Sequence, residues 1–274
     1  MGAAASAVSC ARVATSISDR RRNVSGVTET QPCSRRGSVC AEKGNTMTDS
    51  DYTAMLLVID RSGSMMSIRD DMVGGLNAML TQQMAEPGLL TVDIVTFDNE
   101  IELQCSLANP KDVVITLEPR GGTALLDAVG LAVNGFGQAL AALPEHARPG
   151  TVQVIVVTDG EENSSHEYNA RAVHALVTQQ KEKFSWDFVF LGANQDAVLA
   201  GATMGFDAGS SMTYAAGKEG VDSMASSVGR YVSDVRGKEK RMFLIEERMG
   251  AVQETAEPSA DETPETDADG ASAA

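Results

Sequence analysis

The residues best suited to chemistry in this sequence are two aspartates and three hydroxyl side chains. They are Asp60, Ser62, Ser64, Thr123 and Asp159. The first three form the spacing D-x-S-x-S directly after residues 55–59, a run of five apolar residues. Carboxylate and hydroxyl oxygens are the ligands that hard divalent cations prefer. A carboxylate and two hydroxyls in a tight turn therefore indicate a cation site whose other ligands come from elsewhere in the chain.

The expected sheet explains how these residues meet. Short apolar and β-branched runs are typical of strands buried on both faces, and residues 55–59 and 152–157 both fit this description. Asp60 and Asp159 terminate these two strands, and Thr123 follows two glycines at the start of a long apolar helix. Ligands of parallel sheets bind at the carboxyl ends of the strands. We therefore expect all three side chains at the same edge of the sheet.

The rest of the globular part alternates between helices and strands. Residues 89–97 and 101–107 are separated by a short polar turn, which predicts a hairpin with one antiparallel edge strand. Apolar spacing predicts helices at 68–84, 125–143, 165–183, 196–204 and 221–235, and strands at 188–191 and 211–214. This alternation predicts an α/β fold. We expect a Rossmann-like, doubly wound, mostly parallel central sheet with one antiparallel edge strand and helices on both faces.

These motifs, in this order on such a scaffold, resemble the metal-ion-dependent adhesion site of von Willebrand factor type A (vWA) domains. The resemblance covers residues 55–235 and includes D-x-S-x-S at 60–64, G-G-T at 121–123 and T-D-G at 158–160. It implies that the two serines coordinate a metal directly, the threonine directly or through water, and the aspartates directly or through bridging waters. The metal ligands implied are Asp60, Ser62, Ser64, Thr123 and Asp159. The implied ion is Mg²⁺, or alternatively Mn²⁺ or Ca²⁺.

The ligand set also indicates what the site does. Neutral hydroxyl ligands leave a divalent cation undercompensated in charge, so that it attracts a further anionic ligand. The resemblance implies that a protein partner supplies this ligand as an Asp or Glu carboxylate. We therefore predict a metal-dependent protein–protein interaction module, not an enzyme, with no catalytic or organic-cofactor residues. The alternative is a hydrolase or phosphotransferase that uses the same ion, with His166, Glu161 or Glu162 as the general base.

Single positions of the site also have simpler interpretations. Asp and Ser after a strand often cap the next helix, so Ser62 or Ser64 alone would indicate a cap; the five positions together favour the metal site. Asp127, one turn after Thr123, either supports the site from behind or is an exposed acid in the first turn of its helix. The sequence contains no P-loop, H-E-x-x-H or G-x-S-x-G motif.

Composition excludes several other classes of protein. The net charge of −16 over 274 residues argues against nucleic acid as a partner, because duplex affinity rests on cationic contacts to phosphate. No run reaches the roughly 18 apolar residues of a membrane span. The four cysteines form no C-x-x-C pair, which fits a reducing cytoplasm. The sequence carries no signal for an oligomeric state.

The chain divides into three segments. Residues 1–46 are rich in Arg, Ser and Ala without an apolar period, and we expect a disordered leader or an over-extended start before Met47. Residues 47–250 form the expected vWA domain. Residues 251–274 hold seven acids and neither Lys nor Arg, which predicts an acidic disordered tail.

Overall fold

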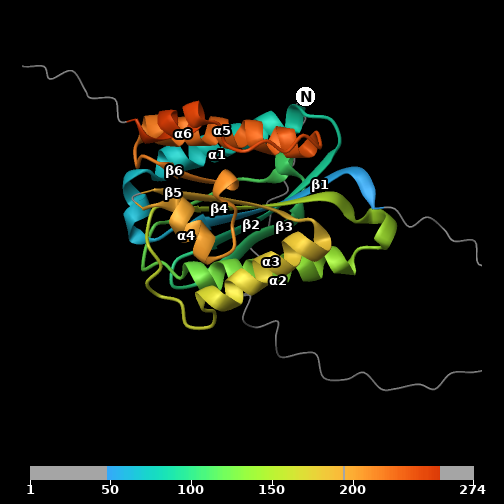
Figure 1. The fold of residues 1–274 in the computed structure, drawn as a ribbon, viewed down its shortest axis with the longest axis horizontal. Coiled ribbons are helices and arrows are strands. Elements are labelled where there is room, and N and C mark those ends of the chain that lie inside the picture. The colour runs from blue at the N-terminus through green and yellow to red at the C-terminus, as the bar shows by residue number, and fades with distance from the viewer. Residues whose placement is uncertain (1–47, 194, 254–274) are drawn as a thin grey trace, which may run out of the picture.

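The computed structural model describes residues 48–193 and 195–253 of the chain. Helices cover both faces of a six-stranded sheet (Figure 1). The strands are β1 (Asp49–Asp60), β2 (Leu89–Phe97), β3 (Ile101–Ala108), β4 (Pro149–Thr158), β5 (Asp187–Ala193) and β6 (Ser211–Tyr214). The helices are α1 (Arg69–Ala85), α2 (Leu125–Ala142), α3 (Ala170–Phe184), α4 (Ala197–Thr203), α5 (Lys218–Arg236) and α6 (Ile245–Val252).

The strands lie in the order β3-β2-β1-β4-β5-β6. Every neighbouring pair is parallel except β2 and β3, which form the antiparallel hairpin at the edge. The predicted fold class is therefore confirmed. Register pairs Asp60 with Phe97 and Thr158 with Gly192, so β1, β2, β4 and β5 end at one common edge.

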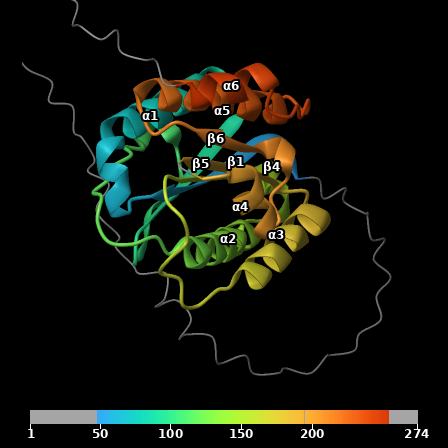
Figure 2. The same cartoon turned by 60° about the vertical axis from the view of Figure 1, so that its left-hand side comes forward.

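Two separate apolar cores flank the sheet, because successive side chains of a strand point to opposite faces. On β1, Met55, Leu57 and Ile59 belong to the core shared with α1, α5 and α6. Leu56 and Val58 belong to the core shared with α2, α3 and α4. Figure 2 shows the two helix layers on either side of the strands. A strand buried in this way must be apolar at every position, which explains the continuous run found in the sequence.

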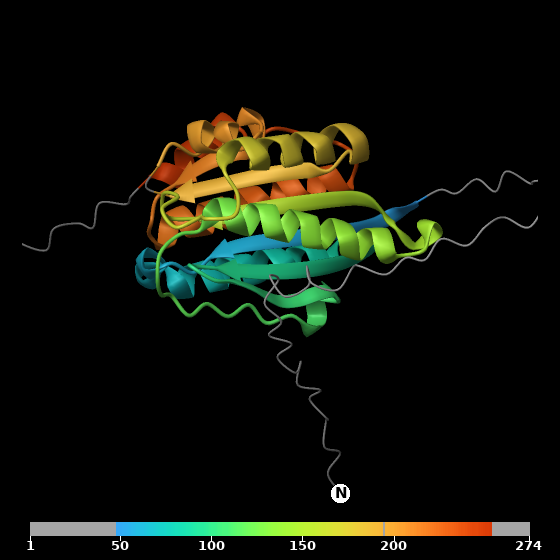
Figure 3. The same cartoon turned by 90° about the horizontal axis from the view of Figure 1, so that it is seen from below.

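Helix α2 is the one helix in the described part of the chain with the length and composition of a membrane span. More than half of it, 56%, is buried inside the domain. It lies along the strands, in green in Figure 3. Its buried residues Val129, Val133 and Phe136 belong to the core beneath the sheet. The apolar composition of α2 is thus that of a core helix.

The predicted helix at 165–183 begins later, at Ala170. The side chain of Asn169 accepts a hydrogen bond from the backbone N of Ala172 (2.9 Å) and caps the helix there. Residues 166–168 instead donate their backbone amides to Asp127, which holds them in a loop. The prediction was therefore wrong by one to two turns.

Helix α6 was not predicted from the sequence. Its short apolar pattern is anchored by Phe243 just before it and Ala251 near its end, which are 5% and 0% exposed. The backbone N of Ala215 donates to the carbonyl of Ala251 (2.7 Å). The folded part therefore continues to Val252, two residues into the segment expected as a tail. The expected leader at 1–46 and the remainder of the tail at 254–274 lie outside the described residues.

Candidate metal centre

The first and last of the predicted ligand motifs meet at the carboxyl edge of the sheet. Asp60 ends β1, and a short 3₁₀ turn at Gly63–Ser67 follows. The Oγ atoms of Ser62 and Ser64 lie 3.1 Å apart. Ser64 Oγ donates to Asp159 Oδ1 (2.7 Å), although 95 residues separate them in the sequence. The parallel pairing of β1 with β4 brings the two motifs together.

Thr123 joins the same group through the space at Gly160. A Cβ atom built on Gly160 would lie 3.2 Å from Thr123 Oγ1, 3.7 Å from Ser64 Oγ and 4.0 Å from Ser62 Oγ. Three hydroxyls from two loops therefore surround the position that a Cβ atom of residue 160 would occupy, and this position is free of side-chain atoms of residue 160 because that residue is glycine. The structure thus brings together the predicted hydroxyl ligands beside the predicted carboxylates.

Four of the five predicted ligands are buried, and the fifth is exposed. Asp60, Ser62, Thr123 and Asp159 are between 0% and 4% exposed, whereas Ser64 is exposed. Beneath them, Tyr214 is buried and donates its hydroxyl to the Thr158 carbonyl (3.1 Å). Access to the oxygens is therefore from the side of Ser64.

Asp60 is held by two hydrogen bonds to neighbouring groups. Its Oδ1 accepts from the backbone N of Ser62 (2.6 Å), and its Oδ2 accepts from Thr158 Oγ1 (2.6 Å). Burial nevertheless raises the pKa of Asp60 to about 6, and the nearby charge of Asp159 contributes in the same direction. Burial also raises the pKa of Asp159, against the opposing hydrogen bond from Ser64. A cation beside these carboxylates would favour their ionised forms.

The residues that fix this arrangement include two whose supporting role the sequence did not predict. Thr158 orients Asp60 from the neighbouring strand. Asn163 brackets Thr123: its Oδ1 accepts from the backbone N of Thr123 (2.9 Å), and its own N donates to the Thr123 carbonyl (3.0 Å). Their only sequence signal is a position within the T-D-G motif, for Thr158, or shortly after it, for Asn163.

Asp127 is buried, so of its two interpretations the exposed acid is wrong. Its carboxylate accepts backbone amides of three successive residues, His166 (2.7 Å), Glu167 (2.9 Å) and Tyr168 (2.6 Å). It thereby anchors the loop that carries Asn163. Asp127 supports the site through this loop and contacts none of the five predicted ligands by a hydrogen bond in the described structure.

The possible general bases around the site differ in their environment. Glu162 Oε2 accepts from the backbone N of Leu126 (2.9 Å) and from Ser165 Oγ (2.7 Å). Its carboxylate is thereby used to hold the start of α2. His166 and Glu161 are exposed. Glu162 is thus a structural residue of the loop.

The predicted metal ligands at this edge include more neutral hydroxyls than charged carboxylates. Within residues 48–193 and 195–253, no three His, Cys, Asp or Glu side chains gather into a group that could hold a metal by themselves. The group consists of two carboxylates and three hydroxyls instead. These oxygen donors fit a hard divalent cation and lack the nitrogen and sulfur ligands of structural zinc sites.

Comparison with known proteins relates this arrangement to solved structures. No family model and no curated protein matches the sequence. Proximal thread matrix protein 1 from the mussel byssus, with a zinc-occupied MIDAS motif, is similar in structure: the TM-score is 0.50 and the identity 15%, over 68% of this chain and 47% of that chain. A second structure of the same protein gives a TM-score of 0.50 and 14% identity, over 68% and 48%.

The ArnB paralog VWA2 from Sulfolobus acidocaldarius gives a TM-score of 0.43 and 16% identity, over 65% of this chain and 44% of that chain. These similar structures are vWA-domain proteins. At such identities the likeness concerns the fold alone. The chain spans about half the length of the solved structures that it matches.

Proposed function

We propose that this chain is a protein-interaction module whose binding depends on a divalent metal. The metal is held by Asp60, Ser62, Ser64, Thr123 and Asp159, and an Asp or Glu carboxylate of a protein partner completes its coordination. The observation that carries the proposal is the convergence of three hydroxyls on the Cα of Gly160, within 4.0 Å of the position that a Cβ atom would take there. The zinc-occupied MIDAS motif of the structurally similar byssus protein supports a divalent ion in such a site.

Each part of the ligand set has a distinct role in this proposal. Asp60, fully buried and fixed by two hydrogen bonds, supplies negative charge from beneath. Ser62 and Thr123 supply neutral oxygens, and exposed Ser64 marks the side from which a partner arrives. When bound, the cation supplies the electrophilic centre that attracts the partner's carboxylate. Mg²⁺ is the proposed ion, because it prefers oxygen ligands and often completes its coordination from outside the protein.

Binding explains the surroundings of the site better than catalysis does. A general base must have a carboxylate or imidazole available to accept a proton from the substrate. Glu162, one of the candidates in the loop, already accepts hydrogen bonds from Leu126, Ser164 and Ser165. We also propose a cytoplasmic location, because the four cysteines form no C-x-x-C pair and fit a reducing compartment.

Calorimetry with Mg²⁺ and Mn²⁺ tests the metal site directly. The wild-type protein is expected to bind both ions, and Asp60→Ala is expected to bind neither measurably. Undiminished metal binding by Asp60→Ala would contradict the proposal. The interaction is tested by affinity capture from a lysate of the native cell: proteins retained with Mg²⁺ should be released by a chelator and not be retained by Asp60→Ala.

A further inference from the structure

The turn between β2 and β3 lies beside the candidate metal centre. Asp98, Asn99 and Glu100 form this turn at the end of β2, next to Asp60, because Asp60 pairs with Phe97 across β1 and β2. Asp98 is only 2% exposed, and its Oδ1 accepts from the backbone N of Glu100 (2.6 Å). The turn therefore has a hydrogen bond of its own, in addition to its contacts with the two metal loops.

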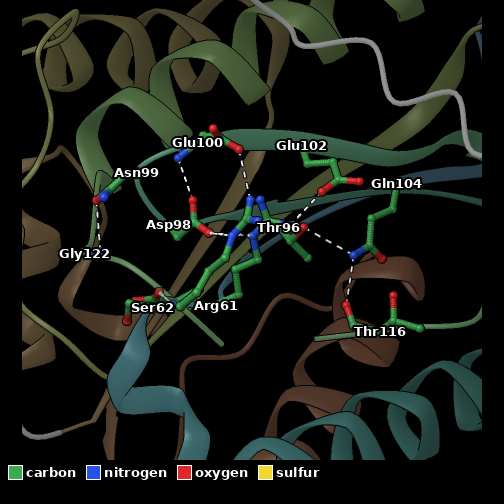
Figure 4. Close-up of polar contacts among 12 residues, drawn as sticks. Arg61, Ser62, Thr96, Asp98, Asn99, Glu100, Glu102, Gln104, Thr116 and Gly122 are labelled. Atoms are coloured by element: carbon green, nitrogen blue, oxygen red, sulfur yellow. Dashed lines mark hydrogen bonds and ion pairs between the residues drawn. The ribbon is translucent and has the colours of Figure 1, made fainter. Parts of the chain in front are cut away.

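The turn holds the first metal loop through Arg61. This residue lies between Asp60 and Ser62, yet its side chain is buried under the hairpin and points to the turn (Figure 4). Arg61 Nε lies 3.2 Å from Asp98 Oδ2, close enough for an ion pair but not aligned for a hydrogen bond. Arg61 Nη1 also pairs with Glu102 Oε2 on β3 (2.6 Å). The loop with Ser62 is thus fastened to the hairpin.

The same turn holds the second metal loop on both sides of Thr123. Arg120 Nε donates to Asp98 Oδ2 (2.7 Å), the oxygen that also pairs with Arg61. The backbone N of Gly122 donates to Asn99 Oδ1 (2.9 Å), as Figure 4 shows, and the backbone N of Ala124 donates to the Asp98 carbonyl (3.0 Å). Three contacts to two residues of the turn therefore enclose the threonine.

The two metal loops are also joined to each other. The backbone N of Gly63 donates to the carbonyl of Gly121 (3.2 Å), and that of Arg120 donates to the carbonyl of Arg61 (2.8 Å). Gly121 has a positive φ of 67°, a conformation that suits glycine and lets the loop pass close to Asn99. The loops and the turn form one hydrogen-bonded unit.

We propose that Asp98 and Asn99 are positioning residues of the metal centre. They hold the loop of Ser62 and Ser64 and the loop of Thr123 at the spacing that the cation requires, without touching the cation. This inference rests on the proposed function and names residues that the D-x-S-x-S, G-G-T and T-D-G motifs do not include. Groups that orient metal ligands in this way typically change metal affinity by about 10–100-fold when removed.

Asn99→Ala is the sharper of two test variants, because Asn99 is exposed and its replacement leaves the core intact. Its matched control is Asn109→Ala at the other end of β3. Asn109 is also exposed, and its Oδ1 also accepts one backbone amide, that of Lys111 (3.0 Å). Asn99→Ala is expected to weaken Mn²⁺ binding by about tenfold and to alter the electron paramagnetic resonance spectrum of bound Mn²⁺. Asn109→Ala should change neither.

The second variant is Asp98→Asn, with Asp93→Asn as its control. Both aspartates are 2% exposed, but among the described residues Asp93 accepts its hydrogen bonds from Ser106 and Leu107 on β3 and from neither metal loop. Asp98→Asn is expected to weaken Mn²⁺ binding by up to about 100-fold. If Asp98→Asn does not fold, Asn99→Ala decides the question.

Wild-type and Asp60→Ala proteins separate the possible failures. Absence of Mn²⁺ binding by the wild type would overturn the proposed function and this inference with it. Loss of Mn²⁺ binding in Asp60→Ala with wild-type affinity and spectrum in Asn99→Ala would overturn the positioning role alone. Loss of affinity in Asn99→Ala but not in Asn109→Ala, at a temperature where circular dichroism shows both folded, would support it.

Discussion

Asp60 and Asp93 are buried aspartates on neighbouring strands with closely similar surroundings. Each accepts one hydrogen bond from a backbone amide and one from a hydroxyl, at distances between 2.6 and 2.8 Å. Burial raises the pKa of both carboxyl groups to about 6. By burial, hydrogen bonding and pKa alone, the two residues would be equally good candidates for a functional site.

Their positions along the strands make the difference. Asp60 ends β1 at the carboxyl edge, where Asp159 and the loop hydroxyls converge. Asp93 lies in the interior of β2, and both of its oxygens are bound by the edge strand β3. A perturbed pKa is therefore insufficient to identify a site. What distinguishes Asp60 is a second carboxylate and several hydroxyls at the same edge of the sheet.

The largest expected effect is a loss of metal affinity when Asp60, but not Asp93, is replaced by Asn. Asp60→Asn keeps the shape of the side chain and removes its charge, which is worth several kcal/mol beside a cation. Calorimetry with Mn²⁺ should therefore show affinity more than about 100-fold weaker. Asp93→Asn should bind Mn²⁺ like the wild type. Equal losses in the two variants would mean that buried charge in general, and not the site, governs binding.

The pH dependence of metal binding provides the second test. A metal ligand must lose its proton, and the pKa of Asp60 is raised to about 6. Below this pH the wild-type affinity for Mn²⁺ should fall by up to about tenfold per pH unit. Asp93→Asn should show the same profile, whereas a flat profile between pH 5 and pH 7 (roughly one unit on either side of the raised pKa) would show that Asp60 does not compete for a proton with the metal.

The sequence alone predicted the fold class and placed the predicted ligands at one edge of the sheet. Consecutive apolar residues identified the parallel strands, and the parallel arrangement forced Asp60 and Asp159 to the same edge. Hydroxyl and glycine motifs are local, so their spacing was visible directly. The metal itself stays a prediction from these motifs.

The supporting residues could not be found in this way. Thr158, Asn163 and Asp98 act through hydrogen bonds to residues 22 to 98 positions away in the sequence, which local periodicity does not encode. The start of α3 was misplaced for a related reason, since Asp127 recruits the amides of the preceding residues. Asp127 shows that a distant acceptor can override the local preference for helix.

The third prediction concerns Gly160, which the three hydroxyls surround. In Gly160→Ala the added Cβ would lie 3.2 Å from Thr123 Oγ1, so the threonine must shift. Gly160 does not have a positive φ, and the effect is therefore steric. Mn²⁺ affinity is expected to fall about tenfold, as for other displaced ligands. Gly74→Ala on α1, with nothing within 4 Å of the new Cβ, should leave the affinity unchanged and stabilise the helix by up to about 1 kcal/mol.

The smallest expected effect is on stability without metal. The raised folded pKa of Asp93, about 6, exceeds the value of roughly 3.9 in an unfolded chain. Between these two values the folded state binds more protons, so rising pH lowers the free energy of unfolding, and this stabilising contribution is lost above pH 6. Asp93→Asn removes this contribution. Urea unfolding should show that the free energy of unfolding of Asp93→Asn rises by about 2 kcal/mol relative to that of the wild type between pH 4 and pH 7.

Mg²⁺ then distinguishes the two aspartates in the same experiment. At pH 7 the cation should raise the free energy of unfolding of the wild type and of Asp93→Asn by the same amount, because it binds only the folded state and acts at Asp60. It should not stabilise Asp60→Asn. If Mg²⁺ stabilised the wild type but not Asp93→Asn, the cation would be acting at the interior aspartate, and the distinction between strand end and strand interior would be wrong.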